Sequence, residues 1–114
     1  MPPAANGQTG TCWIEISAEG KYVYAVNTGT PSISSYEVGA DGILALLGNT
    51  MFNNSDGLRP FDARLSPDGS FLYVVDAGTG MISAFAVDSG TLTELAGSPV
   101  AIGNGATPFG IVVN

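Results

Sequence analysis

Apolar residues occur in short clusters along this chain, and turns that contain glycine, proline or aspartate separate the clusters. Within the clusters, β-branched and aromatic residues are frequent, as in residues 22–26, and this composition favours strands over helices. The predicted strands are 12–17, 21–27, 32–38 and 43–48, followed by 61–66, 70–76, 81–87 and 91–97. Residues 21–27 and 70–76 are apolar enough on both faces to lie in the middle of packed sheets.

The second group of strands repeats the first at a spacing of 49 residues, which falls to 48 after one residue is lost near the third turn. Ser17 and Gly20, for example, recur as Ser66 and Gly69, and residues 109–114 begin the unit a third time. A repeat of this length that holds four antiparallel strands is typical of a β-propeller blade. Such a sheet is apolar on both faces and must stack on neighbouring sheets.

We therefore expect an all-β chain made of β-propeller blades. The expected divisions are a connector (1–11), a first blade (12–60), a second blade (61–108) and the inner strand of a further blade (109–114). A β-sandwich of two duplicated sheets is the alternative fold, but it would leave the last segment without a partner sheet.

Two blades cannot close a ring, because propellers have about four to eight. The expected partners are therefore missing blades of the same propeller or further copies of this chain. A terminal inner strand is what remains when a ring closes by pairing its two ends, which removes a free sheet edge. This favours a C-terminal portion of a larger propeller over self-assembly of copies.

The charge balance limits the classes of partner. Ten acidic and three basic residues give a formal charge of −7, so neither nucleic acid nor an anionic membrane is an expected partner. No apolar run approaches the roughly 20 residues that cross a bilayer, and the N-terminus lacks the features of a signal peptide, which leaves the compartment open. The single Cys12 lies in an apolar strand, where we expect a buried thiol.

The chain contains no histidine, which excludes an imidazole base, a Ser-His-Asp arrangement and an imidazole metal ligand within it. Its acidic residues and its cysteine are not grouped at metal-ligand spacing. We therefore expect neither a metal nor another cofactor.

Charged residues occur in the predicted innermost strands, where small or apolar residues would pack best. Asp62 and Arg64 alternate with apolar residues and share one face, and Glu15 occupies the repeat position of Arg64. Charges there must be solvated or paired, so we expect them to face the central channel. Arg59, just before the second inner strand, is expected near the mouth of that channel.

This arrangement supports a hypothesis about chemistry. Arg59 and Arg64 would bind an anionic lactone such as a phosphosugar or a carboxylate, and Glu15 or Asp62 would position water or act as a base. The alternative is an ion network that lines the channel and has no catalytic role.

Three other residues could contact a ligand but have simpler interpretations. Trp13 replaces Asp62 in the first repeat, and we expect it to pack between blades rather than to stack on a sugar. Asn27 and Asp76 end equivalent strands, and we expect each to bond the backbone of the nearby turn.

Residues 66–76, followed by residues 91–93 and 96–99, resemble the lactonase-type propellers, which are the 6-phosphogluconolactonase-like family and the related YVTN-repeat proteins. Residues 20–27 match the same consensus, and the resemblance extends over residues 6–114. It implies a seven-bladed ring, with hydrolysis of a sugar lactone or lactone cycloisomerisation in some members.

The matching motifs build strands and turns, so the resemblance carries the fold further than the chemistry. A non-catalytic propeller that acts as a binding or interaction scaffold is therefore the second class of function. We expect the chain alone to be inactive, because an unclosed ring cannot hold converging groups in a fixed geometry.

Overall fold

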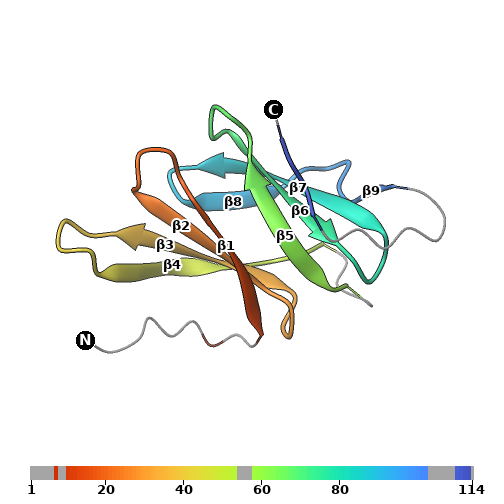
Figure 1. The fold of residues 1–114 in the computed structure, drawn as a ribbon, viewed down its shortest axis with the longest axis horizontal. Helices are drawn as coiled ribbons and strands as arrows, with labels where there is room; N and C mark the ends of the chain where they lie inside the picture. The colour runs from red at the N-terminus through yellow and green to blue at the C-terminus, as the bar shows by residue number, and fades with distance from the viewer. Residues whose placement is uncertain (1–6, 8–9, 54–57, 103–109, 114) are drawn as a thin grey trace.

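The computed structural model describes residues 7, 10–53, 58–102 and 110–113, and the regular elements among them are all β-strands (Figure 1). The strands are β1 (Thr11–Ile16), β2 (Tyr22–Asn27), β3 (Ser32–Val38), β4 (Leu44–Met51), β5 (Pro60–Leu65), β6 (Phe71–Asp76), β7 (Met81–Asp88), β8 (Thr91–Glu94) and β9 (Val100–Ala101). The first sheet is an antiparallel meander in the order β1-β2-β3-β4. The second sheet has the order β5-β6-β7-β8, and β9 pairs with β7 beyond the end of β8.

Local side-chain chemistry fixes the equivalent tight turns between β1 and β2 and between β5 and β6. In the first turn, the Ser17 hydroxyl oxygen accepts hydrogen bonds from the main-chain N–H groups of Lys21 and Tyr22. In the second turn, the Ser66 hydroxyl oxygen accepts one from Phe71. Equivalent serines therefore stabilise the same turn in both repeats.

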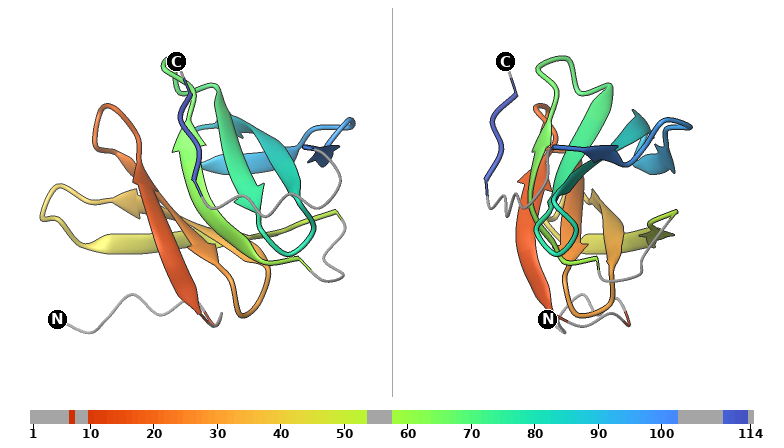
Figure 2. Two further views of the ribbon diagram at one scale, coloured as in Figure 1. Left: turned by 45° about the vertical axis from the view of Figure 1, so that its right-hand side comes forward. Right: turned by 90° about the vertical axis from the view of Figure 1, so that its right-hand side faces the viewer.

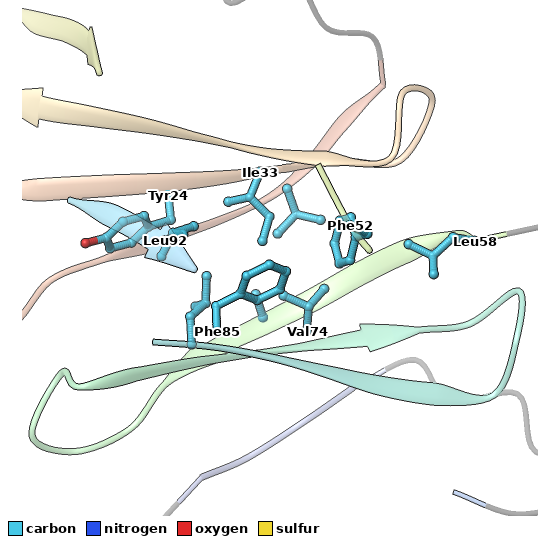
Figure 3. Packing of buried hydrophobic residues seen from close by; sticks show 10 residues of the cluster. Tyr24, Ile33, Phe52, Leu58, Val74, Phe85 and Leu92 are labelled. Atoms are coloured by element: carbon cyan, nitrogen blue, oxygen red, sulfur yellow. The ribbon is translucent and has the colours of Figure 1, made fainter. Parts of the chain in front are cut away.

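The two sheets pack face to face around a shared apolar core. Figure 3 shows Tyr24 and Ile33 of the first sheet directed toward Val74 and Phe85 of the second. All four side chains are at most 1% exposed. The core forms because alternate residues of β2 and of β6 point toward the opposite sheet.

The face of the first sheet that is turned away from the second sheet is also apolar. Val23 and Tyr36 on this outer face are buried by their neighbours within the sheet. Ile14, Ile16 and Leu46 lie on the same face by register and are 58%, 58% and 44% exposed. A sheet that is apolar on both faces is what a stacked blade requires.

Two expectations about the strands were wrong. The fourth strand of the second unit stops at Glu94 instead of reaching residue 97, and pairing resumes only at β9. The chain leaves the ladder in a tight turn at residues 95–98, where the Ser98 N–H donates to the Leu95 carbonyl oxygen at 3.0 Å. In addition, residues 110–113 run alongside β5 without forming a strand (Figure 2), and the remainder of the predicted strand 109–114 lies outside the described residues.

Cys12 was expected to be buried and is instead exposed. The register of β1 against β2 shifts between Thr11 and Trp13, so Cys12 is the extra residue of a bulge. A bulged residue has no cross-strand partner. None of the described residues covers this thiol.

Gly90, in the turn between β7 and β8, is a point of close approach between the sheets. Its φ is +85°, and a Cβ built on it would lie 2.5 Å from Leu47 Cδ1 and 2.9 Å from Tyr22 Cδ1. Gly42 is its equivalent in the first sheet, with a φ of +82° and no atom within 4 Å of the same position. The two glycines thus share the backbone conformation but differ in crowding.

We expect Gly90→Ala to destabilise the chain by about 1–2 kcal/mol more than Gly42→Ala. Both substitutions strain a positive φ, but only the alanine at position 90 forces apart packed side chains of the other sheet. Urea denaturation of the two variants measures the difference. Equal losses of stability would contradict the close packing of the two sheets at this turn.

Candidate functional site

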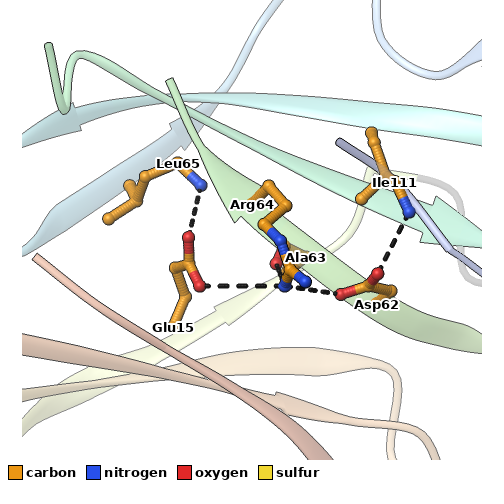
Figure 4. A network of polar contacts seen from close by, with 6 residues as sticks. All are labelled: Glu15, Asp62, Ala63, Arg64, Leu65 and Ile111. Carbon is orange, nitrogen blue, oxygen red and sulfur yellow. Dashed lines mark hydrogen bonds and ion pairs between the residues drawn. The ribbon is translucent and has the colours of Figure 1, made fainter. Parts of the chain in front are cut away.

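The charged residues expected on the inner strands form one network, shown in Figure 4. Arg64 Nη1 donates to Asp62 Oδ1 at 3.0 Å and to the Ala63 carbonyl oxygen at 3.1 Å. The same nitrogen lies 4.0 Å from Glu15 Oε2 on the first sheet. The structure therefore brings together three of the four residues that the sequence indicated.

Each carboxylate of the network also accepts a hydrogen bond from the main chain of the following inner segment. Glu15 Oε1 accepts from the Leu65 N–H at 2.9 Å, which joins β1 to β5. Asp62 Oδ2 accepts from the Ile111 N–H at 3.0 Å, which joins β5 to residues 110–113. In both cases the acid has an equivalent position in the next repeat, and the donor is the residue that directly follows that position in the sequence.

These main-chain bonds decide which groups remain accessible. Both oxygens of Asp62 are bonded, and the residue is only 4% exposed. Among the described residues, no main-chain group donates to Glu15 Oε2, and the Glu15 side chain is 20% exposed. The Arg64 side chain is 41% exposed and makes the bonds described above through Nη1. Arg64 and Glu15 Oε2 are thus the groups of this network best placed to meet a ligand.

Arg59 does not join the network. It precedes the first residue of β5, whereas Arg64 is next to last, and five residues of strand span about 16 Å. Arg59 is exposed, and its guanidinium lies over the Phe61 ring at 5.7 Å from the ring centre. The structure thus places the guanidinium of Arg59 at the Phe61 ring and outside the network.

Asn27 and Asp76 were expected to bond turn backbone, and that expectation was wrong for both side chains. Asn27 Nδ2 donates to the Ser32 and Ser34 hydroxyl oxygens at 3.1 and 3.0 Å. At the equivalent position, Asp76 Oδ2 accepts from the Ser83 hydroxyl at 2.6 Å. Both residues are 0% exposed, so they lie inside the blades and not at a ligand site.

Asp76 is a buried acid that sequence reasoning missed. Burial raises the pKa of its carboxyl to about 6, although the hydrogen bond from Ser83 opposes the shift. Among the described residues, its Oδ1 has no hydrogen-bond partner. The repeat could have indicated this buried acid, because it places Asp76 at the position that Asn27 occupies in the other blade.

Trp13 is 37% exposed and lies opposite Val26 in the register of β1 and β2. Cross-strand partners share a face, so Trp13 lies on the face that is turned toward the second sheet. This position is compatible with packing between blades.

A hollow of about 200 Å³ also lies between the sheets, lined in part by Glu19, Tyr24 and Asp68.

Within the described parts of the chain, no group of three or more His, Cys, Asp or Glu residues is placed to hold a metal ion. None of the described residues forms a helix that is long and apolar enough to cross a membrane.

Comparison with known proteins gives the family. The family model for "Lactonase, 7-bladed beta-propeller" matches residues 1–107. The structure is similar to that of the periplasmic gluconolactonase of Pseudomonas aeruginosa, with a TM-score of 0.76, 24% identity, and coverage of 96% of this chain and 29% of that one. It is also similar to a candidate 6-phosphogluconolactonase of Bacteroides fragilis, with a TM-score of 0.72, 26% identity, and coverage of 85% and 26%.

A second candidate 6-phosphogluconolactonase, from Bacteroides uniformis, has a TM-score of 0.72 and 22% identity, and the match covers 82% of this chain and 27% of that one. No curated protein sequence matched. These coverages show that this chain spans between a quarter and a third of the length of the three solved relatives. The family model matches nearly the whole chain, and the two antiparallel sheets of this chain agree with the fold of that family. This chain therefore belongs to the lactonase family of seven-bladed β-propellers.

Proposed function

We propose that these blades contribute to the hydrolysis of a sugar lactone by a lactonase-type propeller. The observation that carries the proposal is the half-exposed Arg64, held on an inner strand by Asp62 and adjacent to Glu15. Family membership supports the reaction class. The names of the similar structures support a gluconolactone as the kind of substrate, and its phosphorylated form is the one that offers an anionic group to Arg64.

In this proposal Arg64 binds the anionic substituent of the lactone through the guanidinium donors that Asp62 does not use. Asp62 positions the guanidinium, because both of its oxygens are already bonded. Glu15 Oε2 accepts a proton from the attacking water, whose oxygen bonds to the lactone carbonyl carbon. The ring C–O bond then breaks, and the ring oxygen takes up a proton to give the open acid. Arg59, whose guanidinium lies over the Phe61 ring, has no role in this step.

Arg64→Ala in the assembled propeller should lower kcat/KM for 6-phosphogluconolactone by roughly 10- to 100-fold, the effect of losing one charge-assisted contact. Lys21→Ala is the matched control, because Lys21 is an exposed cation over the Tyr22 ring and away from the network. Acid release followed at constant pH measures the rate. Unchanged hydrolysis in the Arg64 variant would reject its role in substrate binding.

One observation favours a second candidate function. Glu15 and Asp62 both bind the main chain of a following segment, so they also join blades. A non-catalytic scaffold would need this structural role alone. Glu15→Gln separates the two functions, because the amide oxygen can still accept from Leu65 N–H but cannot act as a base. Lost hydrolysis with unchanged stability supports the enzyme, whereas unchanged hydrolysis supports the scaffold.

A further inference from the structure

Both walls of the hollow of about 200 Å³ between the two sheets belong to this chain. The first sheet contributes Tyr24 and the turn that contains Glu19, and the second sheet contributes Leu65 and the turn that contains Asp68. The volume is below the range of about 300–1,000 Å³ in which pockets hold drug-sized ligands. The hollow is therefore suited to a small organic molecule.

The charged side chains that line this hollow are both acidic. Glu19 and Asp68 come from different sheets, and both are exposed. Asp68 Oδ1 accepts from the Ser66 hydroxyl at 2.8 Å and from the Ser70 N–H at 3.0 Å. No described residue donates to Asp68 Oδ2 or to the Glu19 carboxylate. A cation between the two acids would therefore find free carboxylate oxygens and would offset two like charges.

The walls favour an organic cation over a metal ion. Leu65 and Val87 are among the lining residues, and they offer no oxygen ligand from their side chains. Calcium takes six or more oxygen ligands, whereas no group of three acidic, histidine or cysteine residues lies together in the described parts of the chain. An ammonium group attached to a short carbon chain matches both the acids and the apolar wall.

Tyr24 supplies a buried hydrogen-bond donor that nothing in the described structure uses. Its side chain is 1% exposed, and its hydroxyl oxygen accepts from the Gly90 N–H. No described residue accepts from the Tyr24 O–H. Burial raises the pKa of Tyr24 to about 12, and the nearby Glu19 charge adds to the shift, so the hydroxyl keeps its proton at neutral pH. Because buried donors are rarely left unpaired, a ligand oxygen is expected beside this hydroxyl.

Tyr22 adds an aromatic ring to the same wall. The ammonium of Lys21, which does not line the hollow, lies 5.5 Å from the centre of this ring. The face of an aromatic ring attracts cations, so Tyr22 can attract a ligand ammonium in the same way.

We propose that this hollow binds a small amino alcohol. The ammonium of the ligand lies between Glu19 and Asp68, and its hydroxyl oxygen accepts the hydrogen bond from Tyr24. An amine without a hydroxyl would leave the Tyr24 donor unpaired, and a neutral diol would leave the two acids without a cation. The charged groups of the Arg64 network do not line the hollow, so the site is independent of the proposed catalytic role.

A nuclear magnetic resonance titration of the full chain with ethanolamine, ethylamine and ethylene glycol tests the site. The Gly90 amide signal is the reporter, because its N–H bonds the Tyr24 hydroxyl. Ethanolamine should shift this signal with a Kd of about 1–10 mM, as expected for so small a ligand. Ethylamine lacks the hydroxyl and ethylene glycol lacks the charge, so each should bind about five- to tenfold more weakly. Equal affinities for the three compounds overturn the proposal, as does a Gly90 signal that ethanolamine leaves unchanged.

Glu19→Gln should weaken the binding of ethanolamine roughly tenfold, because it removes one of the two charges. Asp41→Asn is the matched control, since Asp41 is an exposed acid that does not line the hollow, and the amide oxygen can still accept from the Ile43 N–H. The control should bind like the wild type. Undiminished binding by the Glu19 variant overturns the proposal, as does an equal loss in the Asp41 variant, which would indicate a general attraction to acidic residues.

Tyr24→Phe should lower the affinity for ethanolamine to that for ethylamine and leave ethylamine binding as it is. A preference for ethanolamine that survives this substitution would overturn the role of the hydroxyl. Circular dichroism shows whether the variant keeps its strands. If the variant does not fold, the comparison of ethanolamine with ethylamine on the wild-type chain tests the same hydrogen bond.

Discussion

Phe85→Ala should lower the free energy of unfolding by about 3–5 kcal/mol, the usual cost of deleting a buried aromatic ring. Phe85 is 0% exposed, and its ring meets that of Phe52 edge to face, with the ring centres 5.3 Å apart. It comes from the second sheet but fills the core that both sheets share. The cavity cannot close easily, because hydrogen-bonded strands on both sides hold the neighbouring side chains in place. Urea denaturation followed by circular dichroism measures the loss.

Phe71→Ala is the control for this prediction. Phe71 lies on β6 of the same sheet but is 37% exposed, and its ring centre lies 6.4 Å from that of Tyr73. Its replacement should cost less than about 1 kcal/mol, as surface substitutions usually do. Similar losses for both variants would mean that Phe85 does not occupy a core between two packed sheets.

The fold class followed from the sequence because its determinants are local and occur twice. Ser17 and Ser66 shape equivalent turns, and β2 and β6 both carry apolar residues on their two faces. A repeated unit with apolar residues on both faces requires stacked sheets. The break of the last strand before Pro99 and the bulge at Cys12 were missed. At both places the pairing between strands changes while the pattern of apolar residues stays regular. The apolar pattern could therefore not predict either change.

The candidate site was predictable only in part. Alternation along β5 placed Asp62 and Arg64 on one face, and the repeat placed Glu15 near them. The bonds from Leu65 N–H and Ile111 N–H depend on how adjacent inner segments are offset, which no single strand encodes. The separation of Arg59 from Arg64 could have been foreseen from strand length alone.

The pair Asn27 and Asp76 provides the second large prediction. The pKa of Asp76 is raised in the folded chain to about 6, first by burial and further by the nearby Glu94 charge. The folded state therefore binds a proton more tightly than the unfolded state, and this group's contribution to stability is lost as the pH rises through about 6. Asp76→Asn removes the buried charge and should raise the free energy of unfolding at pH 8 by about 1–3 kcal/mol. Near pH 4 the gain should vanish, because the carboxyl is then neutral in the folded chain.

Asn27→Asp makes the reciprocal change in the other blade. The amide of Asn27 donates to Ser32 and Ser34 in a fully buried place, and a carboxylate there cannot donate to either hydroxyl oxygen. The variant should therefore lose about 3 kcal/mol at pH 8, since it combines a buried charge with two broken hydrogen bonds. Part of that loss should be recovered on acidification, when protonation removes the charge. If Asp76→Asn is neutral at pH 8 while Asn27→Asp is tolerated, the ends of β2 and β6 are accessible to water, and the burial assigned to both residues is incorrect.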